Sequence, residues 1–172
     1  MHLLTHALAG WCVGCSLPMS PKERALCIGV SLLPDVDGLS IVGGVQAFYD
    51  YHHVLAHNLL FAAASSLLIR WPARCRPLMV LLLMALFHLH LLMDLFGSGP
   101  GWGIAYFWPF LSTEYSTRYS WQIDAWQNYA ALATLAVWTI AIAVWQKRTP
   151  FEFVAPRFDS AILASVKRSA PR

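Results

Sequence analysis

The sequence predicts an all-α integral membrane protein, a helical bundle of about four to five segments. Hydrophobic residues make up 58% of the chain and charged residues 12%, about half of the charged share in a soluble domain. Residues 78–96 form an apolar run of the length that a bilayer-spanning helix needs, about 20 residues. Eight Trp, nine Phe and six Tyr residues add aromatic side chains, which are enriched at membrane interfaces.

The first half of the chain contains three apolar segments. Residues 1–18 are apolar and rich in small residues, and a polar turn at 20–24 (SPKER) separates them from a second apolar segment at 25–34. Ten residues are too few to cross a bilayer, so we interpret 25–34 as a half-helix packed beside the first segment; whether it spans stays open. After a glycine-containing loop to about residue 51, a third apolar helix is expected over 54–69.

The second half contains two longer apolar segments. The helix over 78–96 ends at a glycine-rich break, an aromatic stretch follows over 102–121, and the last spanning helix is expected over 129–145. This order predicts a membrane-embedded helical domain over 1–146. A basic tail over 147–172 should follow it, poorly ordered at its end.

The four cysteines include one C-x2-C pair, Cys12 and Cys15, and no second pair that could complete a zinc ribbon. We interpret them as small buried apolar residues. We expect no cleavable signal peptide, because the N-terminal stretch lacks a positively charged region and carries two histidines.

The basic residues predict how the helices are oriented. Eleven of the twelve Lys and Arg residues lie in three places, the 20–24 turn, a turn at 70–77 and the tail. Lys and Arg concentrate in cytoplasmic loops. We therefore expect an inner-membrane protein whose three basic regions, including the C-terminal tail, are cytoplasmic.

This orientation brings the histidines and most acidic residues to the other side of the membrane. All seven histidines and six of the nine acids fall toward the extracytoplasmic ends of their segments. The histidines played no part in setting the orientation, so their clustering is an independent observation. We expect several helix ends to contribute His and Asp side chains to one pocket at the extracytoplasmic interface.

His90 and Asp94 are the most informative pair in the sequence. They are four residues apart in an apolar helix, so they lie above one another on a single face. A carboxylate in hydrocarbon costs about 2.5–3.5 kcal/mol on insertion scales, so where one occurs it typically belongs to a buried pair, a proton path or a metal site. His88 is two residues from His90 and should face elsewhere.

The candidate ligands suit a divalent transition metal. Mixed imidazole and carboxylate ligands favour zinc, with manganese or iron as alternatives, and the set is large enough for one or two ions. Such a metal activates bound water near neutral pH, which indicates hydrolysis of an ester or phosphoester. Asp37 could be a bridging ligand or a general base. The candidates are His6, Asp35, Asp37, His57, His90 and Asp94, with His52 or His53.

Five short motifs follow one another along the first 110 residues. In order and spacing they resemble the family of membrane-bound metal-dependent hydrolases of the YdjM type, and the resemblance implies a membrane-embedded metal site with hydrolase activity. The motifs are His6 with Gly10, LPDVD at 33–37, HHVLAHN at 52–58, His90 with Asp94, and WPF at 108–110.

The third motif departs from the family pattern. The family has Arg-Gly after the first His, whereas this chain has His53 followed by Val54. The resemblance implies His52 as the metal ligand, whereas helical spacing favours His53, four residues before His57. We follow the resemblance, and we predict Asp37 and His52 as the catalytic residues.

The ligand order His, Asp, His, His-x-x-x-Asp is also similar to that of the zinc-dependent phospholipase C group, which is all-helical. That similarity suggests phosphoester hydrolysis, and a lipid substrate would suit a site at the membrane surface. The expected partners are membrane lipids and a lipid or small-molecule substrate. Nucleic acid is not expected, because the basic residues are spread over three membrane-flanking regions.

Two other functions would use the same residues. A metal or proton carrier would also place ionisable groups inside the membrane. A structural membrane protein would use the His–Asp pairs only to lock helices together. Binding of a metal together with hydrolysis distinguishes the hydrolase from both.

Overall fold

The structure, a computed structural model, describes residues 1–73 and 77–169. In these residues the named elements are all helical, which confirms the all-α prediction. Arg74, Cys75 and Arg76 of the predicted basic turn, and residues 170–172 of the tail, lie outside the described residues. The elements are α1 (Leu3–Cys15), α2 (Pro21–Leu32), the 3₁₀ helix η1 (Pro34–Gly43), α3 (Val45–Tyr51), α4 (Leu59–Ala73), α5 (Pro77–Gly97), α6 (Trp126–Trp145) and α7 (Pro156–Ser169).

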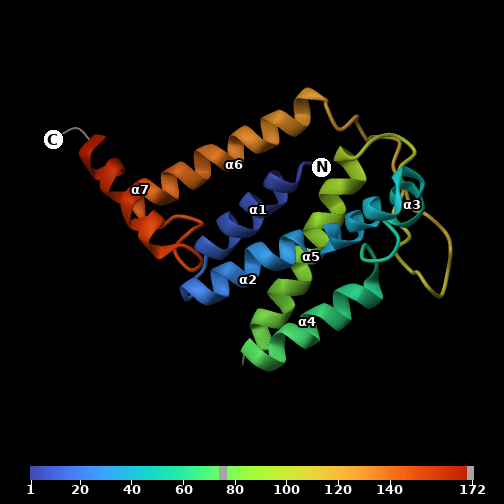
Figure 1. Ribbon diagram of the computed structural model, residues 1–172, viewed down its shortest axis with the longest axis horizontal. Helices are drawn as coiled ribbons and strands as arrows, with labels where there is room; N and C mark the ends of the chain where they lie inside the picture. Colours follow the sequence, from blue (N-terminus) through green and yellow to red (C-terminus); the bar gives the residue numbers. More distant parts are fainter. Residues whose placement is uncertain (74–76, 170–172) are drawn as a thin grey trace.

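The main helices pack side by side in an order that differs from their order in the chain. α6 packs on α1, α1 on α2, α2 on α5, and α5 on α4 (Figure 1). Gly10 of α1 permits one of these close approaches, because a Cβ there would lie 2.5 Å from Ser31 Oγ and 2.6 Å from the Cys27 carbonyl oxygen of α2.

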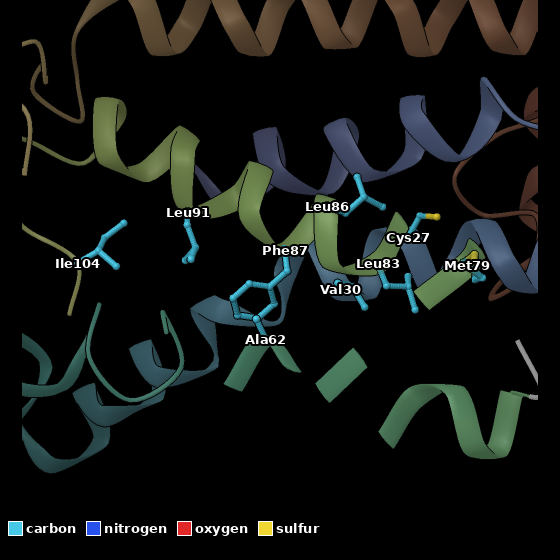
Figure 2. Packing of buried hydrophobic residues seen from close by; sticks show 9 residues of the cluster. All are labelled: Cys27, Val30, Ala62, Met79, Leu83, Leu86, Phe87, Leu91 and Ile104. Atoms are coloured by element: carbon cyan, nitrogen blue, oxygen red, sulfur yellow. The ribbon is translucent and has the colours of Figure 1, made fainter. Parts of the chain in front are cut away.

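The hydrophobic core lies between α2, α4 and α5. Leu83 and Phe87 of α5 are fully buried, and Val30 of α2 and Ala62 of α4 belong to the same cluster (Figure 2). The buried positions of α5 recur every three to four residues, which is the spacing of one helix face. The buried positions of α5 continue beyond this cluster to the polar pair His90 and Asp94.

The predicted number of membrane-spanning segments was too high. Among the described residues, α5 and α6 are long and apolar enough to cross a membrane, and α2 with η1 makes a third span if the two, bent by 50°, count as one. α1 is apolar but has 13 residues. At 1.5 Å per residue it reaches about 20 Å, which is short of a hydrocarbon core of about 30 Å.

The polar stretch at 20–24 is the first turn of α2 and not a separate turn. Ser20 and Glu23 form a reciprocal capping box, and Pro21 occupies the first helical position. Arg24, which contributed to the predicted orientation, is buried and pairs with Glu152 of the tail, with Nη2 donating to Oε2 at 2.9 Å.

The helix expected over 54–69 begins later than its apolar pattern suggests. α4 starts at Leu59, and residues 52–58 form a series of turns. Asn58 caps the helix, because its Oδ1 accepts a hydrogen bond from the Phe61 amide at 2.8 Å. His53 has a φ of +70°, which is incompatible with a helix at this position. The three histidines of this segment therefore lie in a loop.

Much of the tail is ordered. α7 occupies Pro156–Ser169 and packs against α6, and Asp159 accepts hydrogen bonds from the Thr149 hydroxyl (2.7 Å) and amide (3.1 Å). The three described cysteines, Cys12, Cys15 and Cys27, are buried, as predicted.

The chain course gives the molecule two chemically different ends. α7 lies at one end of the molecule, and α3 with the long loop after α5 lies at the other (Figure 1). The N-terminus, η1, the 52–58 loop and the C-terminal end of α5 gather toward the α3 end, because successive helices reverse direction. All the candidate ligands therefore come from one end of the fold.

Candidate metal centre

Helix α5 supplies the centre of the site. His90 and Asp94 are one helical turn apart, both are buried, and His90 Nε2 lies 2.9 Å from Asp94 Oδ2. The Ser31 carbonyl oxygen of α2 accepts from His90 Nδ1 at 2.7 Å. A carbonyl oxygen can only accept, so Nδ1 carries a hydrogen, and Nε2 faces Asp94, where it can take a proton or a metal ion.

The 52–58 loop and η1 add two further ligand atoms. His57 Nε2 lies 3.2 Å from His90 Nε2 and 3.4 Å from Asp94 Oδ2. Asp35 Oδ1 lies 3.7 Å from His90 Nε2 and 4.0 Å from His57 Nε2. Together the four ligand atoms of Asp35, His57, His90 and Asp94 lie within 4.8 Å of one another and could hold a metal ion.

The separation of the two histidine nitrogens fits a tetrahedral ion. Two nitrogen ligands at about 2.0–2.1 Å from a tetrahedral zinc are about 3.3 Å apart. The separation of the two Nε2 atoms is 3.2 Å. Asp94 Oδ2 is fully buried without a hydrogen bond, although His90 Nε2 is 2.9 Å away. Buried polar atoms are normally paired, so a proton or a metal ion belongs where these ligand atoms meet.

The charge of the pocket also favours binding of a cation. Both His57 and His90 use Nδ1 as a hydrogen-bond donor, to Asp37 and Ser31, so two Nε2 lone pairs face each other. An added proton or a metal ion relieves that repulsion. Burial lowers the pKa of His57, but the hydrogen bond to Asp37 and the carboxylate of Asp94 outweigh burial and raise it to about 9. The pocket therefore favours positive charge where the ligand atoms meet.

Asp37 orients ligands and does not point toward the convergence point. Its Oδ2 accepts from His57 Nδ1 at 2.9 Å and from the Ala56 amide at 3.0 Å, and its Oδ1 accepts from His52 Nδ1 at 2.7 Å. A carboxylate behind a ligating histidine fixes the tautomer and orientation of the ring. The sequence left two roles open for Asp37, a bridging ligand and a general base, and this geometry matches neither of them directly. Asp37 instead lies behind two histidines.

The structure gives His52 and His53 different surroundings. His52 is held by Asp37 and lines the open cleft beside the centre. His53 Nε2 is 3.8 Å from Asp94 Oδ2, and its Nδ1 is buried with no hydrogen bond. Burial, reinforced by the neighbouring His57, lowers the pKa of His53 to about 3, so this ring is neutral. His52, His53 and His57 also form a second group with ligand atoms within 4.8 Å of one another.

His6 of α1 approaches the other oxygen of Asp94. Its Nε2 is 3.2 Å from Asp94 Oδ1, and its ring stacks on His90 with centroids 3.8 Å apart. Ser98, one turn after Asp94, donates to the same Oδ1 at 3.1 Å, and the Met1 amino group contacts it as well. The structure thus gathers all seven predicted ligands, with four at the convergence point and His6, Asp37 and His52 around it.

Sequence reasoning missed the groups that surround the ligands. The i+4 spacing from Asp94 could have identified Ser98, but nothing in the sequence marks the Ser31 carbonyl. His88 faces elsewhere as predicted, because its Nε2 hydrogen-bonds the Tyr106 hydroxyl at 2.8 Å. A cleft of about 340 Å³ opens beside the centre. Its lining includes Asp35, Asp94, His52, His53, Phe48 and Trp102, and no Lys or Arg among the described residues.

The family model of the YdjM inner membrane proteins matches residues 1–165. The protein belongs to this family. The match includes every candidate ligand, the five motifs and most of the tail. No curated protein and no solved structure matches the chain. The family is described as inner membrane proteins, and the chain has two or three helices long and apolar enough to cross a membrane.

Proposed function

We propose that this YdjM family protein is a membrane-bound, metal-dependent hydrolase of phosphoesters, with phospholipids among its substrates. The single observation that carries the proposal is the convergence of Asp35, His57, His90 and Asp94 on one point beside an open cleft. Mixed imidazole and carboxylate ligands suit zinc, with manganese or iron as alternatives. When bound, such a metal polarises a phosphoryl oxygen and activates water near neutral pH.

The residues around the metal ligands have separate tasks in this proposal. Asp37 holds His57 in the tautomer that leaves Nε2 as a ligand. His52 lines the cleft and is bound through Nδ1 to Asp37, so its Nε2 is available to move a proton to or from the substrate. His53 is neutral and unpaired at Nδ1, and it can join the ligand set or donate to a phosphoryl oxygen.

The proposal places the centre on the extracytoplasmic side and the tail in the cytoplasm. The support is the distribution of charge, since Lys22 lies in the first turn of α2 and Lys147 and Arg148 follow the last turn of α6, at the ends of these helices away from the centre. Arg24 adds little to this support, because its charge is neutralised by Glu152. The support rests on Lys22, Lys147 and Arg148, which are at least partly exposed.

The variant His52→Ala tests the proposed division of roles. We expect it to keep its metal and to lose hydrolysis of a phosphodiester by about 10²–10⁴-fold, the usual contribution of an acid–base residue. The measurement is metal content by elemental analysis beside kcat with bis-p-nitrophenyl phosphate. His88→Ala is the matched control, because His88 bonds to Tyr106 away from the centre. Full activity in His52→Ala would remove His52 from the mechanism, and a metal-loaded wild type that hydrolyses no phosphoester would contradict the proposal.

A further inference from the structure

The rim of the cleft is apolar although it lies at the end of the fold that carries the polar centre. η1 and α3 form a hairpin over residues 38–51, which we call the apolar hairpin. Its side chains are unusually exposed, with Leu39 at 66%, Val42 at 89% and Val45 at 64%. α3 contains no buried residue. Asp50 is the only charged residue of the hairpin.

The apolar hairpin forms one wall of the cleft. Phe48 and Tyr49 of α3 line it, and the Trp102 ring from the loop after α5 packs on both at centroid distances of 5.7 Å. Ile123, which also lines the cleft, is 42% exposed. Phe110 of the same loop is 77% exposed. The exposed apolar groups that line the cleft therefore come both from the hairpin and from the loop after α5.

The hairpin is continuous with a candidate membrane span. α2 and η1 together are long and apolar enough to form one membrane span, bent by 50° where they meet. Contiguous exposed apolar surface of this kind marks a contact with a membrane or with another protein. The hairpin has no Lys or Arg with which to bind an acidic partner, and Tyr and Trp at the cleft match the aromatic belt of a membrane interface. Both observations favour lipid as the occupant.

We propose that the apolar hairpin is immersed in the membrane leaflet on the side of the metal centre, and that the substrate is a membrane lipid that enters the cleft from this leaflet. The substrate assignment rests on the hydrolase function proposed above, whereas the position of the hairpin does not. The lipid phosphoester reaches Asp35, His52 and Asp94, which line the cleft, while its acyl chains stay beside the hairpin. Hydrolysis breaks the ester P–O bond, a water oxygen forms the new P–O bond, and the departing alcohol takes a proton of that water.

The position of the hairpin is tested with a fluorescent probe on Val42→Cys. The protein, in a Cys75→Ser background, is labelled with an NBD maleimide and placed in vesicles of phosphatidylethanolamine and phosphatidylglycerol. We expect blue-shifted emission that brominated lipids quench. The same label on the exposed, charged position Asp124→Cys is the matched control and should stay in water. The Cys75→Ser protein alone gives the labelling blank, since the other three cysteines are buried.

The substrate is tested with Val42→Asp beside Val42→Leu. A carboxylate in the leaflet costs enough on insertion scales that Val42→Asp should lower hydrolysis of vesicle phospholipid by about tenfold or more. Hydrolysis of bis-p-nitrophenyl phosphate, which does not need the leaflet, should keep its wild-type kcat/KM. Val42→Leu should resemble the wild type on both substrates.

The outcomes separate this inference from the function on which it rests. The inference is overturned if the NBD emission at Val42→Cys reports water, even if phosphoesters are hydrolysed. It is also overturned if the label is shielded from water only in protein whose copies cross-link through the hairpin. Unchanged phospholipid hydrolysis by Val42→Asp also overturns it. Absence of hydrolysis of both substrates by the metal-loaded wild type contradicts the proposed function instead, and with it the substrate assignment. If Val42→Asp fails to fold, the probe measurement decides the position of the hairpin.

Discussion

Asp35 and Asp37 are two residues apart, yet the structure gives them different tasks. Asp35 Oδ1 joins the convergence point, whereas Asp37 holds His52 and His57 from behind. In a 3₁₀ helix with about three residues per turn, positions two apart point in widely different directions. The sequence predicted both as ligands, because the Leu-Pro-Asp-x-Asp motif does not reveal a 3₁₀ helix. Which end of the fold they occupy could be predicted; which way each carboxylate points could not.

The two carboxylates should respond differently to removal of their charge. We expect Asp35→Asn to lose a ligand and with it most of the bound metal. Asp37→Asn should still bind the metal, with affinity weakened by about 10–100-fold, as is typical for the carboxylate behind a ligating histidine. Zinc affinities from chelator competition check both variants. Loss of metal that is greater in Asp37→Asn than in Asp35→Asn would reverse the assignment.

Metal affinity should also depend on pH through His57. Its pKa, raised to about 9 in the metal-free protein, means that the ring is protonated at neutral pH and must release that proton to bind a metal. Apparent zinc affinity should therefore rise by about tenfold per pH unit between pH 6 and 8 and level off near pH 9. His53, with a pKa of about 3, is already neutral and adds nothing to this slope. Chelator competition at several pH values measures this slope. A zinc affinity that does not change with pH would show that His57 is not protonated in the metal-free protein.

The 52–58 loop is a segment that helical periodicity predicted wrongly. Helical spacing favoured His53 with His57, but α4 begins only at Leu59, so that argument did not apply. Asn58 was the available signal, because Asn is a preferred N-cap and its Oδ1 bonds the Phe61 amide. The turns instead let His53 and His57 both face Asp94 and leave His52 at the cleft. In contrast, the uniform apolar pattern of α5 predicted its course over 78–96 within one residue at each end.

Packing of α1 on α2 should control the geometry of the centre. An added Cβ in Gly10→Ala would overlap Ser31 Oγ and the Cys27 carbonyl, so we expect overpacking to cost about 1–3 kcal/mol. Displacing Ser31 should also disturb His90, whose Nδ1 donates to the Ser31 carbonyl. Gly29→Ala is the matched control, because a Cβ there meets nothing within 4 Å, and it should stabilise α2 by about 0.5–1 kcal/mol. Thermal unfolding in detergent compares the two, and equal Tm values would contradict the close approach.

At the scale of the whole molecule, the charge pattern predicted the gathering of ligands at one end. That part succeeded because reversal of successive helices is set by chain topology and does not need exact element boundaries. The number of spans was overestimated, because apolar composition alone does not distinguish a short buried helix such as α1 from one that crosses the bilayer. The membrane side of each end is a separate prediction.

The orientation can be measured in intact cells. In the Cys75→Ser background, Asp124→Cys, which follows the cleft-lining residue Ile123, should react with a membrane-impermeant maleimide added outside the inner membrane. Ser160→Cys on the exposed face of α7 should react only after the membrane is permeabilised. The reverse pattern would place the centre in the cytoplasm.

The most direct test of the account is the metal content of the purified protein. Asp94 contacts His6, His57 and His90 at once, so it is the residue on which the centre depends most. Elemental analysis of wild type and Asp94→Asn, purified in mild detergent, should find one or two zinc, manganese or iron atoms per chain in the wild type and a loss in the variant. A folded wild type that carries no transition metal and cannot be reloaded with one would contradict the account, and the His–Asp cluster would then be a structural lock between helices.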